Sequence, residues 1–372
     1  MISAPPGFSS QLGMLFVSLV VGIAAAGAAH VAARERCDEA ASSNCYFSVS
    51  AGNGALHFYA SRLSGSGGPQ PVNALIAVHG HPRDANLTFN AALRSARSAA
   101  ALERTVVIAP LFQVANERAA RCKTAGVPAA QTGDLLWTCD SWADGAQADN
   151  RGRITSFAAM DALIADLVTR WPGLRTVTVA GFSAGAQLVQ RYIGFAADSH
   201  NVAVRYVVAD PGVWLYFDAQ RAQPRLDGAP VGWERCDGGA GGLGRCELAW
   251  SAPENSCADF NRWRYGIEGL PAALGRDAAA ARRHYADADI HYLEGALDTG
   301  ESAAAIYKLL DKSCAAQLQG PYRLQRGLVF AEYDRHVLSP ARQREVQIVP
   351  GCAHDVACVF SAPAARAALF VP

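Results

Sequence analysis

The stretch Arg175-Thr-Val-Thr-Val-Ala-Gly-Phe-Ser-Ala-Gly185 joins an apolar run to a pentapeptide centred on a serine. The run before Gly181 is short and β-branched, which favours a buried strand. Residues 184–195 carry Ala, Gln and Leu, which favour a helix. A chain that passes directly from strand to helix turns sharply, and Gly181 and Gly185 allow the backbones to pass closely. The turn lifts the Ser183 hydroxyl above the sheet at a helix N-terminus, where negative charge is favoured.

The bulk composition is that of a globular protein with a substantial core. The chain has 372 residues, of which 51% are hydrophobic and 18% charged. Its 33 basic residues balance its 33 acidic residues, giving a formal net charge of zero. There is no basic stripe, acidic tail or repeat of fixed period, so neither a nucleic acid nor a strongly cationic partner is predicted.

The N-terminal segment is apolar. Residues 14–29 are a continuous run of apolar and small residues. Ala26-Gly-Ala28 at its end and Val31-Ala-Ala33 after it are candidate cleavage signals. We interpret residues 1–33 as a signal peptide, with residues 34–372 as the mature domain. The leading segment lacks Lys and Arg, so an uncleaved N-terminal membrane anchor is the alternative, because about 20 apolar residues span a bilayer. Either interpretation places the domain outside the cytoplasm, as a secreted, periplasmic or outward-facing anchored protein.

The ten cysteines support export. They are Cys37, Cys45, Cys122, Cys139, Cys236, Cys246, Cys257, Cys314, Cys352 and Cys358. An even number in an exported chain favours disulfides. The sequence contains no C-x-x-C and no Cys and His cluster with zinc-ligand spacing, so no metal is predicted. Neighbouring cysteines give the simplest pairs, Cys37–Cys45, Cys236–Cys246 and Cys352–Cys358, and the alternative is that two or more remain buried thiols.

Apolar runs at regular intervals predict a sheet. Residues 46–61 alternate around Asn53-Gly54, the pattern of a β-hairpin. Further strands are expected at residues 73–78, 104–109, 175–180, 204–209, 289–293 and 345–349, and residues 154–170 have helical spacing. Apolar strands separated by helical segments imply a parallel sheet covered on both faces. With the hairpin, this gives a mixed sheet of about eight strands.

Residues 212–285 interrupt this alternation, because they are too many for a plain connection between two strands. They contain Trp214, Trp233, Trp250, Trp263 and three cysteines. We expect a lid-like insertion over the carboxyl-terminal edge of the sheet, where α/β proteins bind ligands. Its aromatic residues either line an apolar substrate pocket or form the insertion's own small core, and the second arrangement is the more common.

The serine needs a base, because a hydroxyl is a poor nucleophile until its proton is removed. His354 lies in Pro350-Gly-Cys-Ala-His-Asp355, on a loop that follows the last predicted strand. A histidine raised on such a loop can lean over the strand-to-helix turn. A bridge between Cys352 and Cys358 would hold the loop in place. The competing interpretation of His354 is an ordinary polar loop residue.

Asp298 is the candidate acid, since it follows the predicted strand at residues 289–293. A buried carboxylate there would accept a hydrogen bond from His354, fix its tautomer and stabilise the imidazolium. Asp210, at the end of the preceding strand, is the alternative acid. Asp355 is a weaker alternative, because its adjacency to His354 gives poor geometry.

A tetrahedral intermediate needs backbone donors for its oxyanion. The first expected donor is the N–H of Ala184. The second comes from the loop His79-Gly-His-Pro-Arg-Asp84, where Gly80 permits close approach and His81 supplies the N–H. Arg83 is expected either to brace this loop through an ion pair or to be a surface charge that contributes under about 1 kcal/mol.

These stretches together resemble the α/β-hydrolase superfamily over residues 70–360. The resemblance is carried by Val78-His-Gly-His-Pro-Arg-Asp84, Gly181-Phe-Ser-Ala-Gly185, Gly295-Ala-Leu-Asp-Thr299 and Pro350-Gly-Cys-Ala-His-Asp355. Within the superfamily, the chain resembles exported bacterial serine hydrolases of the esterase and polyester-depolymerase type. The resemblance implies a mostly parallel sheet with helices on both faces and a lid inserted between the sixth and seventh strands. It also implies an esterase-like triad of Ser183, Asp298 and His354.

The sequence therefore predicts a serine hydrolase that acts outside the cytoplasm on small or polymeric carboxylic esters, through an acyl-enzyme and without a cofactor or metal. No nucleic-acid partner is expected, and contact with a membrane is expected only if the N-terminal segment is retained. Two alternatives stay open. One is a serine peptidase or amidase with the same triad, and the other is a non-catalytic binding protein on the same fold.

Overall fold

The computed structural model describes residues 37–62, 69–150, 153–198, 201–236, 242–254 and 257–371. All of them belong to the compact unit Arg36–Pro372. The predicted signal peptide or anchor at residues 1–33 lies outside the described residues. Within the described ranges, no helix has both the length and the apolar character needed to cross a bilayer.

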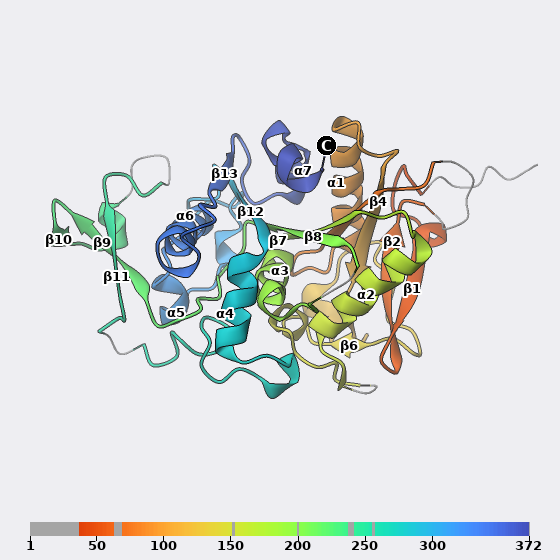
Figure 1. The fold of residues 1–372 in the computed structure, drawn as a ribbon, viewed down its shortest axis with the longest axis horizontal. Helices are drawn as coiled ribbons and strands as arrows, with labels where there is room; N and C mark the ends of the chain where they lie inside the picture. The colour runs from red at the N-terminus through yellow and green to blue at the C-terminus, as the bar shows by residue number, and fades with distance from the viewer. Residues whose placement is uncertain are drawn as a thin grey trace, which may run out of the picture. The chain divides into compact units, whose positions relative to one another are not determined.

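An eight-stranded sheet forms the centre of the fold, with the strand order β1-β2-β4-β3-β7-β8-β12-β13 (Figure 1). Its strands are β1 (Tyr46–Ala51), β2 (Gly54–Ala60), β3 (Asn73–Val78), β4 (Thr105–Leu111), β7 (Thr176–Phe182), β8 (Ala203–Ala209), β12 (Asp289–Gly295) and β13 (Val346–Val349). Strand β2 is antiparallel to β1 and β4, and all other pairs are parallel. The predicted mixed sheet of eight strands is confirmed.

Helices cover both faces of this sheet. Alternate residues of β3 show why, since Ala74 and Ile76 belong to one buried cluster while Leu75 and Ala77 belong to another. The first cluster includes α2 (Ser156–Arg170), α3 (Ala184–Phe195), α4 (Ala278–Asp287) and α6 (Arg323–Tyr333). The second includes α1 (Ala85–Ser98), α7 (Val356–Ser361) and α8 (Arg366–Leu369). Figure 1 shows α1 and α7 together on one side, with α2, α3 and α4 on the other.

Shorter elements complete the part of the chain that the structure describes. The strands are β5 (Gln113–Val114), β6 (Leu136–Trp137), β9 (Arg221–Leu226), β10 (Ala229–Pro230) and β11 (Glu247–Ser251), and the remaining α-helix is α5 (Cys314–Gln317). The single-turn segments are η1 (Ser43–Cys45), η2 (Ala119–Cys122), η3 (Ser141–Asp144), η5 (Trp233–Arg235), η6 (Ala272–Leu274), η7 (Tyr307–Leu309), η8 (Asp334–Leu338) and η9 (Pro363–Ala365).

The N-terminal hairpin forms as predicted, but its turn lies one residue earlier. Ala51 pairs with Gly54, so the two loop residues are Gly52 and Asn53 rather than Asn53 and Gly54. Gly52 has φ +57°, a left-handed conformation that glycine adopts without a Cβ penalty. A glycine with positive φ at the first loop position is the pattern of a type II′ turn, whose twist matches that of the strands.

The predicted insertion lies between the sixth and seventh strands of the sheet, β8 and β12. It contains the small antiparallel sheet β10-β9-β11, which Figure 1 shows beyond α6 at the left. Its last part, α4, packs against α3 and so belongs to the main helical layer. Disulfide Cys257–Cys314 ties the insertion to the segment that follows β12.

Three of the insertion's four tryptophans differ from both expectations, because they attach it to the main core. Trp214 is fully buried and stacks on Phe330 of α6, with ring centroids 4.4 Å apart. Trp250 and Trp263 are partly buried and pack against the same large cluster. Tertiary contact with the sheet layer, rather than a local core or a substrate pocket, therefore accounts for these three rings.

All ten cysteines form disulfides, and no free thiol remains. The three neighbouring pairs are those predicted, Cys37–Cys45, Cys236–Cys246 and Cys352–Cys358. The other two, Cys122–Cys139 and Cys257–Cys314, join residues 17 and 57 positions apart. They close longer loops than the neighbouring pairs and so restrict the unfolded chain more.

Candidate active site

Ser183 lies at the turn between β7 and α3, with φ +57° and ψ −119°. This conformation is costly for a residue with a side chain and is concentrated at functional sites. A Cβ on Gly181 would collide with the carbonyl of Gly185, and a Cβ on Gly185 would collide with the carbonyl of Val78. Both glycines are therefore required for the close passage of strand and helix that the sequence pattern predicts.

The three residues predicted as a triad meet at the carboxyl ends of β7, β12 and β13. Ser183 Oγ lies 2.8 Å from His354 Nε2, and His354 Nδ1 lies 2.7 Å from Asp298 Oδ2. The imidazole is thus arranged to accept the serine proton at Nε2 while its Nδ1–H donates to the carboxylate. His354 and Asp298 are buried, and Ser183 is partly exposed.

Burial and neighbouring charges set the protonation of His354. Its pKa is lowered from the ordinary value of 6.5, first because burial disfavours the imidazolium and further because of the positive charge of Arg323. The hydrogen bond to Asp298 opposes this shift. The backbone N–H of His354 donates to Ala304 at 3.1 Å, and disulfide Cys352–Cys358 closes its loop. His354 is therefore held in place and neutral near pH 7, as a general base must be.

Arg323, the first residue of α6, contacts the candidate acid. Its Nη1 lies 3.2 Å from Asp298 Oδ1 and donates to the carbonyl of Ala305 at 2.6 Å. Both members of this ion pair are buried. Sequence reasoning missed Arg323, because one arginine opening a helix 25 residues after the aspartate gives no local signal.

Asp210, the alternative acid, lies beside the triad without the hydrogen bond that the role requires. The ligand atoms of Asp210, Asp298 and His354 lie within 4.8 Å of one another, but His354 Nδ1 bonds to Asp298. Asp210 Oδ1 accepts instead from the N–H of Gly295 at 2.8 Å. Burial, and then the charge of Asp298, raises the pKa of Asp210 to about 7.

These three side chains are also close enough together to hold a metal ion. The geometry disfavours one, because the guanidinium of Arg323 already neutralises Asp298 at 3.2 Å. A metal would also have to replace the hydrogen bond between His354 and Asp298. The donor set therefore fits a proton relay better than a cation site.

Glu294 forms a buried acid pair with Asp210. Burial raises the pKa of Glu294 well above its usual value, and the neighbouring Asp210 raises it further. Among the described residues, no N–H or hydroxyl donates to either Glu294 oxygen or to Asp210 Oδ2. The two carboxyl groups are within hydrogen-bonding reach, so one shared proton pairs an oxygen of Glu294 with an oxygen of Asp210. A Cβ on Gly327 of α6 would collide with the Glu294 carboxyl, so glycine leaves the necessary space.

Two backbone N–H groups are candidates for binding the oxyanion of a tetrahedral intermediate. Ala184 is the first residue of α3, so its N–H has no acceptor within the helix. A Cβ on Gly80 would lie only 3.7 Å from the Cβ of Ser183, which places the loop after β3 beside the serine. Gly80's own N–H donates to Asp84 Oδ1 at 2.9 Å and is unavailable to substrate. The N–H of His81 has no acceptor among the described residues and is the second candidate donor.

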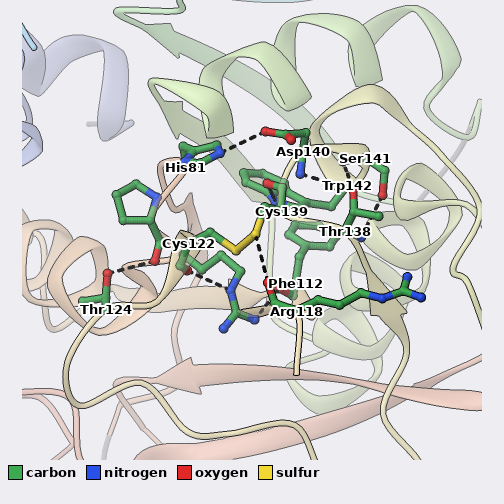
Figure 2. Close-up of a disulfide and its surroundings, with 12 residues drawn as sticks. His81, Phe112, Arg118, Cys122, Thr124, Thr138, Cys139, Asp140, Ser141 and Trp142 are labelled. Carbon is green, nitrogen blue, oxygen red and sulfur yellow. Dashed lines mark hydrogen bonds and ion pairs between the residues drawn. A yellow bond between two sulfur atoms is a disulfide. The ribbon is translucent and has the colours of Figure 1, made fainter. Parts of the chain in front are cut away.

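The loop that carries His81 is braced from behind by disulfide Cys122–Cys139 and its surroundings (Figure 2). Arg83 is buried, and its guanidinium donates to the carbonyl of Cys122 at 3.1 Å. Thr124 Oγ1 donates to the carbonyl of Pro82 at 2.8 Å, and His81 Nε2 lies 2.9 Å from Asp140, the residue after Cys139.

The role of Arg83 differs from both roles that the sequence suggested, an ion pair and a surface charge. Besides Cys122, its guanidinium donates to the carbonyl of Phe112 and to the amide oxygen of Gln113, at 3.4 and 3.1 Å. Within the described ranges it has no carboxylate partner closer than 4 Å. Arg83 therefore stabilises the loop by hydrogen bonds to neutral oxygens, and it is neither an ion-pair member nor a surface charge.

The triad opens into a cavity of about 520 Å³. Its wall includes Gly80, His81, Pro82, Leu87, Asp140, Asp144, Ser183, Ala184, Gln187, Ile306, Leu309, Asp311 and His354. From residues 212–285, Gly212 and Arg264 line the cavity, and none of the four tryptophans does. Arg264 pairs with Asp144 at 3.0 Å and lies 3.9 Å from Asp311. The insertion is thus joined by ion pairs to two other segments of the wall.

No family model matches the sequence, and no curated protein does. Solved structures match the fold. Poly(aspartic acid) hydrolase-1 from Sphingomonas sp. KT-1 gives a TM-score of 0.55 at 18% identity, covering 87% of this chain and 97% of that one. The poly(3-hydroxybutyrate) depolymerase LpqC from Bordetella parapertussis gives 0.53 at 16% identity, covering 84% and 85%. Together with the strand order, these similarities establish the predicted α/β-hydrolase fold.

Proposed function

We propose that this chain is a serine hydrolase that cleaves carboxylic esters outside the cytoplasm. The observation that carries the proposal is the continuous chain of hydrogen bonds from Ser183 through His354 to Asp298 at the wall of an open cavity. Two candidate oxyanion donors, the N–H groups of Ala184 and His81, belong to residues that line the same cavity. An arrangement of nucleophile, base, orienting acid and donors is what acyl transfer requires.

The reaction begins when Ser183 Oγ attacks the ester carbonyl and its proton passes to His354 Nε2. Asp298 stabilises the resulting imidazolium, and the N–H groups of Ala184 and His81 stabilise the oxyanion. The carbon–oxygen bond to the alcohol then breaks, and His354 returns the proton to the leaving oxygen. Water, deprotonated by His354, attacks the acyl-enzyme and releases the carboxylic acid and free Ser183.

Amide hydrolysis by the same residues is the second candidate. The two similar structures carry the names of a poly(3-hydroxybutyrate) depolymerase and a poly(aspartic acid) hydrolase, so the fold accommodates different polymers. An ester has the better leaving group, because an alkoxide needs less help from the general acid than an amine does. We therefore place ester cleavage first.

The test is turnover of p-nitrophenyl esters and of matched anilides by purified protein. We expect ester hydrolysis by the wild type, and a loss of roughly 10⁵–10⁶ in kcat in Ser183→Ala with an unchanged melting temperature. Cleavage of anilides without esters would favour the amidase. Full activity of Ser183→Ala would refute the serine mechanism, and no turnover of either series would favour a binding protein.

Export is the remaining part of the proposal. Five disulfides are consistent with an oxidising compartment, and residues 1–33 remain the predicted signal peptide or anchor. The check is N-terminal sequencing of the protein recovered from periplasm, membrane and medium. A mature N-terminus near residue 34 in a soluble fraction supports cleavage, whereas an intact N-terminus in the membrane fraction supports the anchor.

A further inference from the structure

The large apolar side chains that the described residues expose are concentrated at the cavity of Ser183. They are Leu87, Leu297, Ile306 and Leu309, with exposed fractions of 50%, 55%, 37% and 65%. Three of the four, Leu87, Ile306 and Leu309, line the cavity. Single exposed leucines are ordinary, but a group at one cavity indicates contact with an apolar ligand.

The segments that carry these side chains are fixed to His354. Ala304 accepts the backbone N–H of His354 at 3.1 Å, and Ala305 accepts from Arg323 at 2.6 Å. Ile306 follows directly. Leu87 lies in α1, which packs against α7, a helix that begins two residues after His354. The apolar side chains therefore keep a defined position relative to the reacting atoms.

Ile306 has an unfavourable backbone conformation for its residue type. Its φ is +47°, in the left-handed region, where a β-branched side chain clashes with its own backbone. Glycine or asparagine would adopt this conformation at lower cost. The backbone alone thus gives no reason for isoleucine here, whereas a role for its side chain in the cavity does.

Several charged residues of the same wall are paired with one another. Arg264 is paired with Asp144 and lies near Asp311. Arg94 is different, because it lines the cavity, is exposed and has no ion-pair partner among the described residues. A substrate carboxylate bound at Arg94 is therefore the competing ligand that an experiment must separate from an aliphatic chain.

We propose that Leu87, Ile306 and Leu309 bind a medium-length aliphatic chain of the substrate and so determine its chain-length specificity. This inference rests on the proposed ester hydrolysis. A cavity of about 520 Å³ is within the range of sites that enclose such a ligand. Contact with the apolar side chains removes the aliphatic chain of the substrate from water, which favours binding. The braced loop that carries His81 then holds the ester carbonyl of the substrate near Ser183.

The test compares kcat/KM for p-nitrophenyl acetate, butyrate, hexanoate and octanoate. In the wild type we expect kcat/KM to rise about fourfold per buried methylene until the cavity is filled. Leu87→Gln and Leu309→Gln should flatten this rise, because the loss in kcat/KM grows with the length of the aliphatic chain. The matched control is Leu297→Gln, since the exposure of Leu297 lies between those of Leu87 and Leu309 but Leu297 does not line the cavity, and it should leave the profile unchanged.

Ile306→Asn separates a role in specificity from a structural role. Asparagine tolerates the left-handed backbone better, so the melting temperature should rise. The preference for octanoate over acetate should fall on the order of tenfold at the same time. A lower melting temperature with an unchanged preference would show that the isoleucine serves only the fold and would overturn its part in the inference.

The outcomes distinguish this inference from the proposed function. An active wild type with a flat chain-length profile overturns the inference and leaves ester hydrolysis standing. A preference for substrates whose chain ends in a carboxylate would also overturn the inference and leave ester hydrolysis standing, if Arg94→Gln abolishes that preference. No turnover of any ester in the series contradicts the proposed function itself.

Discussion

Asp210 and Asp298 follow the neighbouring strands β8 and β12, and their hydrogen bonds distinguish them. Asp298 accepts from His354 Nδ1, whereas Asp210 accepts from the backbone of Gly295. We expect Asp298→Asn to lower kcat about 10⁴-fold, because the amide favours the wrong imidazole tautomer. Asp210→Asn should cost far less. Steady-state kinetics of both variants checks this, and a larger loss in Asp210→Asn would reverse the assignment.

His354 determines how the reaction depends on pH. It acts as a base only when neutral, and burial lowers its pKa below 6.5. The value of kcat/KM should therefore rise with pH through a midpoint below 6.5 and be level near pH 7. Arg323→Gln should move the midpoint upward, because the positive charge that disfavours the imidazolium is removed, while Arg323→Lys should move it less. A wild-type midpoint above 6.5 would contradict the role of burial.

At the scale of elements, disulfide Cys122–Cys139 supports the loop that carries His81. The contacts of Arg83 and Thr124 connect the disulfide to that loop. In Cys122→Ser/Cys139→Ser we expect kcat to fall roughly 10-fold to 100-fold with little change in KM, because a misplaced oxyanion donor weakens the transition state. The control is Cys37→Ser/Cys45→Ser, which removes the disulfide before β1. Equal losses in the two folded variants would show that the effect is not specific to the loop.

Several elements could be predicted from local sequence. Strand β3 and helix α3 have the boundaries expected, since apolar periodicity and the two glycines around Ser183 act within a few residues. The hairpin turn differs by one residue, because Gly52 as well as Gly54 suits a tight turn. Helix α1 was not predicted, although the pattern was present, since Phe89 and Leu93 lie on its buried face and Arg94 and Arg97 are exposed.

The missed features depend on contacts between distant residues. The sequence placed Asp298 and Asp210 at the same sheet edge and favoured Asp298, with Asp210 as the alternative, but the hydrogen bond to His354 that distinguishes them depends on the folded chain. Arg323 and the Cys122–Cys139 pair become visible only when the chain is folded. Trp214, Trp250 and Trp263 also depend on distant contacts, since their rings pack on Phe330, Tyr333 and Phe195 of other segments.

At the scale of the whole molecule, the buried acids make stability depend on pH. The pKa of Glu294 is raised well above 4.5 in the folded chain, so the folded state keeps a proton that the unfolded state releases. This contribution to the free energy of unfolding is fully present below pH 4.5 and is lost as pH rises. Glu294→Gln keeps the size of the side chain and an N–H donor toward Asp210. Because glutamine does not titrate, the variant does not lose this contribution as pH rises.

Urea unfolding of wild type and Glu294→Gln between pH 5 and 8 measures this effect. The variant should become more stable relative to the wild type with rising pH, by up to about 1.4 kcal/mol per pH unit. Comparing the two proteins cancels the opposite contributions of the buried His79 and His354. A stability difference that does not change with pH would show that Glu294 is ionised in the folded state.

Labelling with a fluorophosphonate probe tests most directly whether Ser183 is an activated nucleophile. Intact-mass spectrometry would be carried out on wild type, Ser183→Ala and Leu297→Gln, each shown to be folded by its melting curve. We predict one adduct on wild type and on Leu297→Gln, and none on Ser183→Ala. The absence of an adduct on folded wild type, or an adduct that persists in Ser183→Ala, would contradict the proposed serine hydrolase.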